Sequence, residues 1–251
     1  MAEYNADDYH AIINEGKKEL IEVEGIVYRR LALRTHVMTP EDDLCRVAVH
    51  YAKPLLREGD ILFFTEKAVA AVQGRAVPVD EIKPSLLARL LVKFVYKNPG
   101  GIGISMAESM EMAIRECGRP RILLAAFVSA IGKLLGRRGW FYIIAGYRAA
   151  SIDGPADYVI EPYNRCVVLG PLEPDKTARD ISTALGCPVI ITDINDLGGQ
   201  ILGASSPAIN RDLMTRILKD NPLGQSKQQT PMGIIRAYCG EKNLDNNAKA
   251  Y

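Results

Sequence analysis

Short apolar runs rich in β-branched and aromatic residues alternate along the chain with stretches in which apolar residues recur at helical spacing. Runs such as Val189–Thr192 have the length and composition of buried strands. The leucines of residues 84–96 have the spacing of an amphipathic helix. The pattern therefore predicts a mixed α+β fold, with strands expected at residues 60–64, 75–79, 121–132, 140–145, 165–169 and 189–192.

Capping residues and glycines indicate where helices begin and end. Thr39 followed by Pro40 is typical of a helix start, and Ser105 has capping-box spacing with Glu108. Gly186 is expected to end the helix before the last predicted strand. The predicted helices cover residues 7–20, 39–57, 65–72, 84–96, 105–117, 174–185, 210–219 and 233–238.

The composition narrows the possible functions. A chain of 251 residues with 48% hydrophobic content can form one large domain or two modest ones around a proper core. Lys and Arg (31) nearly balance Asp and Glu (30), and the net charge of +1 creates no global field to recruit nucleic acid or an acidic membrane. We therefore expect neither nucleic-acid binding nor membrane association.

The cysteines and histidines follow no disulfide or metal pattern. Five cysteines, without CxxC spacing, argue against a disulfide framework and a structural zinc site. The acidic, polar amino terminus has no apolar core of a secretory signal, so a reducing cytoplasm is expected. The residues concerned are Cys45, Cys117, Cys166, Cys187, Cys239, His10, His36 and His50.

Two acids follow the apolar run Val189–Thr192. Asp193 and Asp196 are expected at the carboxyl end of this strand, before a sharp turn at residues 197–199. Carboxylates at such strand ends can hold Mg²⁺ or Mn²⁺ against nucleotide phosphates. The alternative is that Asp193 caps a turn and Asp196 is solvated, because Asp is a common turn residue.

Two loops are candidates for contact with anions. Residues 98–104 are rich in glycine and precede a predicted helix start, which favours a phosphate or carboxylate, but the P-loop lysine is missing and a purely structural turn is equally compatible. Lys133–Trp140 mixes basic and aromatic residues that could touch lipid headgroups. A basic loop beside an anionic ligand is the interpretation that we favour.

Several segments in matching order and spacing resemble the coenzyme F420 γ-glutamyl ligases. They are residues 39–44, 59–62, 73–75, 145–146, 152–154 and 191–193. The resemblance spans most of residues 1–251 and implies an α+β fold of two interlocked domains, with uncertain internal boundaries, in a homodimer. It also implies GTP- or ATP-dependent addition of L-glutamate to an acidic coenzyme acceptor, either the deazaflavin or a folate-like acid. Mg²⁺ or Mn²⁺ would assist, and K⁺ is a further candidate ion.

The resemblance assigns metal and catalytic roles to few residues. Asp193 matches the family's metal-binding acid, and Ile194 stands where relatives often carry a threonine. Arg148 stands near the family's second acid and cannot ligate a cation. Either Asp153 replaces that acid, with Asp196 as a further candidate ligand, or the two-metal arrangement has been abandoned. Arg148 would then contact a phosphate through its guanidinium, and Asp153 could equally be a turn residue.

The nucleotide contacts carry over in four places. The loop before the acidic helix start matches the family's base-contacting loop, and the loop near the carboxyl end takes the place of a glycine-rich nucleotide loop, with an ordinary solvated connection as the alternative. The candidate residues are Thr35, His36, Val37, Met38, Glu66, Lys67, Ser151, Gly224, Gln225, Ser226, Lys227, Gln228, Gln229 and Thr230.

Two functional hypotheses follow. The first is an ATP- or GTP-dependent γ-glutamyl ligase for an acidic acceptor, which Lys133, Arg137 and Arg138 would suit. The second is a nucleotide- or cofactor-binding homologue that has lost ligase chemistry, and it is motivated by Arg148 and Ile194.

Overall fold

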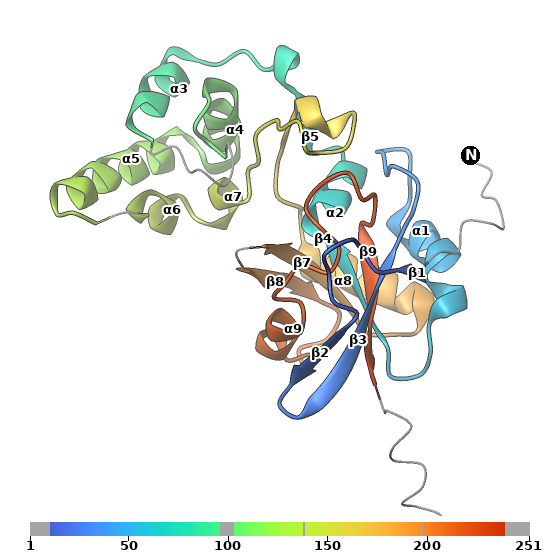
Figure 1. Cartoon of the computed structure of the whole chain (residues 1–251). Helices are drawn as coiled ribbons and strands as arrows, with labels where there is room; N and C mark the ends of the chain where they lie inside the picture. Colours follow the sequence, from blue (N-terminus) through green and yellow to red (C-terminus); the bar gives the residue numbers. More distant parts are fainter. Residues whose placement is uncertain (1–10, 96–102, 138, 197, 239–251) are drawn as a thin grey trace, which may run out of the picture. The chain divides into compact units, whose positions relative to one another are not determined.

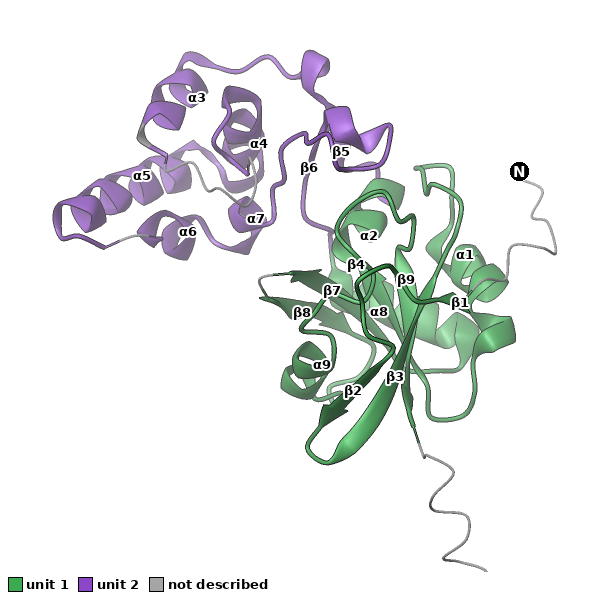
Figure 2. Ribbon diagram, in the orientation of Figure 1, with its two compact units in different colours: residues 1–72, 173–251 green, residues 73–172 purple. Residues whose placement is uncertain are grey.

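A computed structural model describes residues 11–95, 103–137, 139–196 and 198–238 (Figure 1). The chain divides into two compact units (Figure 2). Unit 1 contains residues 1–72 and 173–251, and unit 2 contains residues 73–172. The chain therefore leaves unit 1 after Val72 and returns to it at Glu173.

Unit 1 is built on a mixed seven-stranded sheet. Its order is β1-β3-β9-β4-β7-β8, with β2 also paired to β3. Only β4 and β7 run parallel, and the other pairs are antiparallel. The strands are β1 Ala11–Ile12, β2 Leu20–Val23, β3 Ile26–Leu33, β4 Ile61–Thr65, β7 Val189–Asn195, β8 Gly198–Ala204 and β9 Met232–Ala237.

Both faces of this sheet are buried, which explains why β4 and β7 are continuous apolar runs. Along β4, Leu62 and Phe64 pack into one core, while Phe63 packs into the other. Along β7, Ile191 packs into the first of these cores and Ile190 into the second, because successive side chains of a strand point to opposite faces. The helices of unit 1 are α1 Leu44–Tyr51, α2 Glu66–Val72, α8 Pro174–Leu185 and α9 Arg211–Ile217, with a 3₁₀ turn η2 at Lys53–Leu55.

Unit 2 is mainly helical and has its own core, in which Ile104, Met110 and Ile122 are fully buried. Two short strands pair antiparallel beside the helices. Its elements are β5 Ala76–Pro78, η3 Val79–Glu81, α3 Leu86–Leu91, η4 Val92–Phe94, α4 Ala107–Cys117, α5 Arg119–Leu134, α6 Trp140–Ala145, α7 Tyr147–Ala150, η5 Tyr163–Arg165 and β6 Cys166–Val168.

The mixed α+β class is confirmed, and so are many individual elements. The predicted strands at 60–64, 75–79, 165–169 and 189–192 correspond to β4, β5, β6 and β7. The helix starts at Thr65 and Asn210 are also confirmed, because their side chains accept hydrogen bonds from the backbone N–H groups of Ala68 and Leu213. Gly186, with φ of 75°, ends α8 as expected.

Four predicted elements are wrong. Residues 121–132 and 140–145 form helices α5 and α6, because an apolar run carries no periodicity that separates a buried strand from a helix. Of residues 233–238, all but Tyr238 lie in strand β9, whose pairing with β3 and β4 overrides the helix signal of Thr230-Pro231. Within the described part of residues 7–20, the chain forms β1 and a turn instead of a helix.

The start of α1 also differs from the prediction. Asp43 is the N-cap and accepts a hydrogen bond from the N–H of Arg46 at 2.9 Å, while Thr39 donates its own N–H to Asp42. The helix is also shorter than predicted, since it ends at Tyr51. Residues 98–102 of the glycine-rich loop lie outside the described residues. In the described ranges, no helix combines the length and the hydropathy needed to span a bilayer.

Candidate functional site

One edge of the sheet in unit 1 collects most of the residues predicted to bind nucleotide and metal. The register places Met232 opposite Leu33 in β3 and Phe64 in β4, and it places Thr65 opposite Thr192 in β7. The carboxyl ends of β3, β4 and β7 and the amino end of β9 therefore lie at the same edge. The segments that follow or precede them are residues 35–38, 66–67, 193–196 and 224–230.

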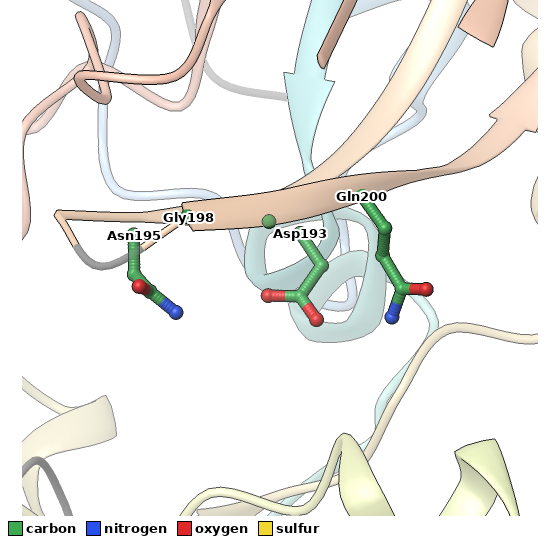
Figure 3. Close-up of a pocket in the computed structure, with 5 residues that line it drawn as sticks. Asp193, Asn195, Gly198 and Gln200 are labelled. Atoms are coloured by element: carbon green, nitrogen blue, oxygen red, sulfur yellow. The ribbon is translucent and has the colours of Figure 1, made fainter. Parts of the chain in front are cut away.

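The hairpin of β7 and β8 forms an open pocket at this edge. Asp193, Asn195 and Gln200 line it together with Gly198 and Gly199, and the three side chains project from the same face (Figure 3). Their common direction follows from the pleat, since Asp193 and Asn195 are two residues apart and Gln200 lies opposite Asp193 in the register. The pocket thus presents one carboxylate and two amide groups to a ligand.

Gly199 allows the two strands of this hairpin to approach closely. A Cβ at this position would overlap the carbonyl oxygen of Asp193 and lie 2.6 Å from the Cα of Ile194. Both atoms belong to the backbone, so a side chain here requires the hairpin to move. The position of Asp193 therefore depends on glycine at 199.

Gly199→Ala is expected to distort the hairpin beside Asp193. We expect the free energy of unfolding to fall by about 1–3 kcal/mol, as for other overpacked sites, and any turnover that depends on Asp193 to fall at least about tenfold as this residue shifts. Denaturant titration and turnover assays measure the two effects. Gly25→Ala is the control for activity, because Gly25 lies in the β2–β3 turn with nothing near its missing Cβ, while its φ of 77° lets alanine cost stability there without moving Asp193. Equal activity losses in both variants would contradict the prediction.

Thr192 and Ile194 are not on the ligand side of the hairpin. Thr192 is buried, and its hydroxyl donates a hydrogen bond to the Phe64 carbonyl at 3.1 Å. Ile194 packs against the core that contains Phe63 and Ile190. Its side chain thus serves packing on the face opposite Asp193.

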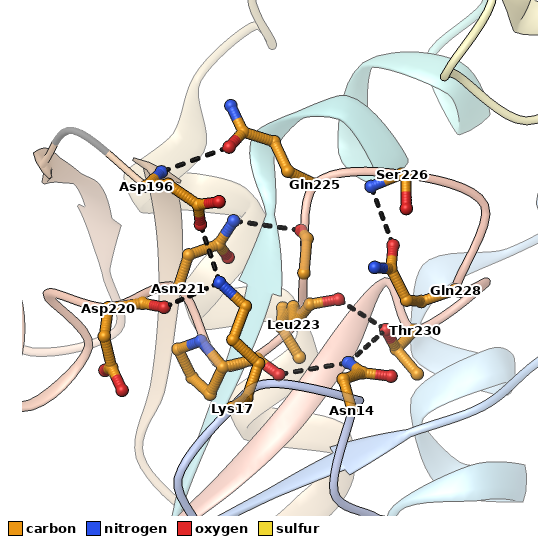
Figure 4. Close-up of polar contacts among 12 residues, drawn as sticks. Asn14, Lys17, Asp196, Asp220, Asn221, Leu223, Gln225, Ser226, Gln228 and Thr230 are labelled. Atoms are coloured by element: carbon orange, nitrogen blue, oxygen red, sulfur yellow. Dashed lines mark hydrogen bonds and ion pairs between the residues drawn. The ribbon is translucent and has the colours of Figure 1, made fainter.

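Asp196 belongs to a different set of contacts from Asp193. Its carboxylate forms an ion pair with Lys17 at 2.7 Å, and its N–H donates to Gln225 at 3.2 Å (Figure 4). Lys17 also donates to the Asp220 carbonyl at 2.9 Å. This structure thus uses Asp196 to connect the hairpin to the amino-terminal segment and to the loop of residues 220–230.

The loop of residues 224–230 is held by internal and long-range hydrogen bonds. Thr230 is buried, donates to the Leu223 carbonyl at 2.7 Å and accepts from the buried Asn14 at 3.0 Å. The N–H of Ser226 donates to Gln228 at 2.7 Å (Figure 4). Gln225, Ser226 and Lys227 remain exposed at the sheet edge, while Gly224 adopts a φ of 77°.

The loop after β3 contacts the loop of residues 224–230 directly. The N–H of Thr35 donates to the Gln229 carbonyl at 3.2 Å, and the Gln229 amide donates to the Thr35 carbonyl at 2.6 Å. His36 lies within hydrogen-bonding distance of Tyr51 and Asp42, at 3.0 and 2.9 Å. Two predicted nucleotide segments that are far apart in sequence are therefore joined.

The remaining predicted contacts of unit 1 differ in exposure. Met38 is buried in the core with Leu33 and Val47, so its side chain is committed to packing, and Val37 is half-buried. Glu66 is buried at the start of α2, and Lys67 is exposed beside it. Of these two charged residues, Lys67 is the one whose side chain a ligand can reach.

Arg148, Ser151 and Asp153 lie in unit 2. Arg148 is exposed on α7, and the backbone of Asp153 bridges Val168 through two hydrogen bonds of 2.9 Å. Burial, and to a smaller extent the charge of Asp153, raises the pKa of Tyr142. Ser151 is buried, and its hydroxyl has no hydrogen-bond partner among the described residues.

The site fits a cation that is shared with a phosphate ligand. Among the described residues, no three Asp, Glu, His or Cys side chains gather into a group that could hold a metal. The pocket does contain the Asp193 carboxylate and the amide oxygens of Asn195 and Gln200, which are hard donors of the kind that Mg²⁺ and Mn²⁺ prefer. Such ions commonly bind through one or two carboxylates, with phosphates and water in the other positions.

The four described cysteines are free thiols. Burial raises the pKa of Cys45, Cys117, Cys166 and Cys187, and this keeps them protonated and poorly nucleophilic. Cys166 is buried, and the other three pack against the hydrophobic cores of their units.

Sequence reasoning missed Asn195 and Gln200. Asn195 had a usable signal, because it follows Asp193 at the two-residue period of a strand. Gln200 becomes a neighbour of Asp193 only through the register of the hairpin, which includes an irregularity between Ile191 and Thr192. Lys17, which binds Asp196 from far away in sequence, had no local signal.

Comparison with known proteins points to one enzyme family. The family model described as F420-0:Gamma-glutamyl ligase matches residues 32–209. The coenzyme F420:L-glutamate ligase of Methanopyrus kandleri is 26% identical to this chain over an alignment 231 residues long, and the alignment covers 78% of this chain and 81% of that protein. The family match includes Asp193, Asp153 and Arg148, and it ends before the loop of residues 224–230.

Proposed function

The chain belongs to the F420-0:gamma-glutamyl ligase family, a family of amide-forming ligases, and we propose that it is a GTP- or ATP-dependent enzyme that joins L-glutamate to a coenzyme carboxylate. The acceptor class is an acidic coenzyme, either the deazaflavin or a folate-like acid. One observation carries the proposal: the topology of unit 1 brings residues 35–38, 66–67, 193–196 and 224–230 to one edge of the sheet. A triphosphate binding there would be near Asp193.

The proposed reaction activates a poor acyl donor. The acceptor carboxylate takes the γ-phosphoryl group, and the nucleoside diphosphate leaves. The amino group of glutamate then attacks the acyl phosphate, so that an amide bond forms, phosphate leaves and one proton is released. Catalysis of phosphoryl transfer is largely a matter of positioning and electrostatics.

Each residue group has a distinct role in this proposal. Asp193, with Asn195 and Gln200, would hold the cation, which neutralises charge on the phosphates when bound. Lys67 and Lys227 are exposed and would pair with phosphate oxygens. The two loops that contain Thr35 and Gln229 are hydrogen-bonded to each other, and they would surround the base of the nucleotide. The roles proposed for Ser151 and Arg148 of unit 2, in binding the nucleotide or the acidic acceptor, rest on the family resemblance and not on the geometry of unit 1.

Two departures from the family pattern favour a second candidate, a nucleotide-binding homologue without ligase activity. Arg148 stands near the position of an acid, and the Ile194 side chain is committed to the core. In this candidate the sheet edge would still bind a nucleotide with a cation. The family's second metal position would be lost.

Mass spectrometry of the reaction mixture separates the two candidates. The full chain is incubated with GTP or ATP, Mn²⁺, L-glutamate and either a deazaflavin coenzyme lacking glutamate or a folate. We expect one acceptor to gain the mass of a glutamyl residue only when nucleotide is present. Nucleotide binding without any adduct would support the second candidate, and absence of nucleotide binding would contradict both.

A further inference from the structure

The near neutrality of the whole chain hides a strongly basic segment. Between Glu116 and Asp153 the sequence contains six Lys or Arg residues and no Asp or Glu, so this segment carries a net charge of +6 in a chain whose total is +1. The basic residues are Arg119, Arg121, Lys133, Arg137, Arg138 and Arg148. The segment comprises α5, α6 and α7 of unit 2.

Helix α5 exposes an apolar stripe on the side opposite its core contacts. Ile122 and Ala125 face the core of unit 2. The exposed stripe recurs at intervals of three and four residues, as expected for one face of a helix. It consists of Leu123, Leu124, Phe127, Ile131 and Leu134, with Phe127 65% and Leu134 87% exposed, and Leu135 extends it.

Helix α6, which packs beside α5, also exposes apolar side chains. It packs against α5 (Figure 2), where Gly132 lies so close to Trp140 that a Cβ would be 3.0 Å from the indole ring. Near the carboxyl end of α6, Arg121 of α5 donates a hydrogen bond to the Ile144 carbonyl at 2.8 Å. Ile143 of α6 is 73% exposed and Tyr142 is partly exposed at 40%, so both helices of this braced pair present apolar side chains to solvent.

We propose that this helix pair is a docking surface for an anionic phospholipid bilayer. Isolated exposed apolar residues are ordinary, but a continuous apolar stripe on a helix within a segment of net charge +6 matches an interfacial helix. Leu124, Phe127, Ile131 and Leu134 enter the boundary between headgroups and acyl chains. Lys133 and Arg137, both exposed near the end of α5, meet lipid phosphates and carboxylates.

The charge of the segment favours a bilayer over a second copy of the chain as the occupant. Two copies that met through α5 would bring together segments of +6 each without any acidic partner inside them. The negative charge of an anionic bilayer would attract this segment, whereas the positive charge of a second copy would repel it. The sixteen residues of α5 are too few to cross the hydrocarbon core, so the helix lies in the plane of the interface.

Vesicle sedimentation of the full chain tests this proposal. The probe is phosphatidylcholine vesicles with about 30% phosphatidylserine, compared with vesicles of phosphatidylcholine alone. We expect sedimentation with the anionic vesicles, and release when salt is raised from about 0.1 M to about 0.5 M. Neutralising Lys133 or Arg137 to Gln is expected to weaken partitioning about fivefold each.

Variants of the stripe test its part in binding. Phe127→Ser is expected to weaken partitioning at least about tenfold, because the apolar contact is lost. Leu86→Ser is the matched control for Leu134→Ser, since both leucines are 87% exposed in unit 2 and Leu86 lies outside the basic segment. Circular dichroism verifies that each variant is folded.

Three results would overturn the proposal. The first is no sedimentation of the wild-type chain with anionic vesicles. The second is equal loss in Leu86→Ser and Leu134→Ser. The third is a vesicle-free dimer, measured by light scattering, that Phe127→Ser dissociates, because the stripe would then be covered by a second copy. None of these readouts depends on ligase activity, so the proposed function can fail or hold independently.

Discussion

Asp193→Asn is expected to lower the rate of glutamyl transfer by about 100-fold or more while leaving the fold intact. The amide has nearly the same size as the carboxylate, but it lacks the negative charge that would hold a divalent cation beside phosphates. Asp193 is half-buried at the end of β7 and lines the pocket, so its change affects the site and not the core. Nucleotide affinity, titrated with and without Mn²⁺, should lose its dependence on the ion.

Asp196→Asn is the matched control for this prediction. It removes an acid three residues along the same hairpin, but one that pairs with Lys17 at 2.7 Å and does not line the pocket. We expect activity to change less than about threefold, because an exposed ion pair contributes little. Equal losses in both variants would show that Asp193 has no special role at the pocket.

The framework of unit 1 was predictable because its local signals agree with its tertiary structure. The apolar runs of β4 and β7, the capping side chains of Thr65 and Asn210 and the terminal Gly186 each point to the element that forms. The position of Asp193 was predictable for the same reason, since an acid at the end of a buried strand can be recognised without knowledge of the strand's partners.

The errors arise where tertiary context decides. Residues 121–132 are apolar on nearly every side, so their sequence does not distinguish a strand from α5, which buries Ile122 and exposes Phe127. Residues 232–237 are a strand only because β3 and β4 flank them. The same limit applies to the site, where Gln200 and Lys17 reach their places through strand register and chain crossing.

A buried ion pair next to the loop of the site leads to the largest expected effect on stability. Arg30 on β3 is fully buried and donates to both carboxylate oxygens of Asp220, to the Ile217 carbonyl at 3.0 Å and to the Lys18 carbonyl at 2.6 Å. Among the described residues, the positive charge of Arg30 is thus compensated by one carboxylate, that of Asp220. Removing that carboxylate leaves a guanidinium without a counterion in a site closed to water.

Asp220→Asn is therefore expected to lower the free energy of unfolding by about 2–3 kcal/mol, somewhat less than for a fully enclosed pair because the Asp220 side chain is 35% exposed. Urea titration at neutral pH measures this loss. Glu24→Gln is the control, since Glu24 pairs with Arg216 at the surface and should contribute less than about 1 kcal/mol. Similar losses in the two variants would contradict the special role of burial.

The pH dependence of the pair gives a second test. Burial raises the pKa of Asp220, but the hydrogen bonds and charge of Arg30 outweigh it, so the pKa in the folded protein lies below its usual value of 3.8. The unfolded chain then binds this proton more readily, and the stabilisation is present above about pH 4 and disappears as the pH falls through the lowered pKa. Between about pH 6 and pH 3 the wild-type protein should thus lose more stability than Asp220→Asn. Parallel curves for the two proteins would mean that Arg30 is neutralised by another group, and the role of Asp220 would have to be abandoned.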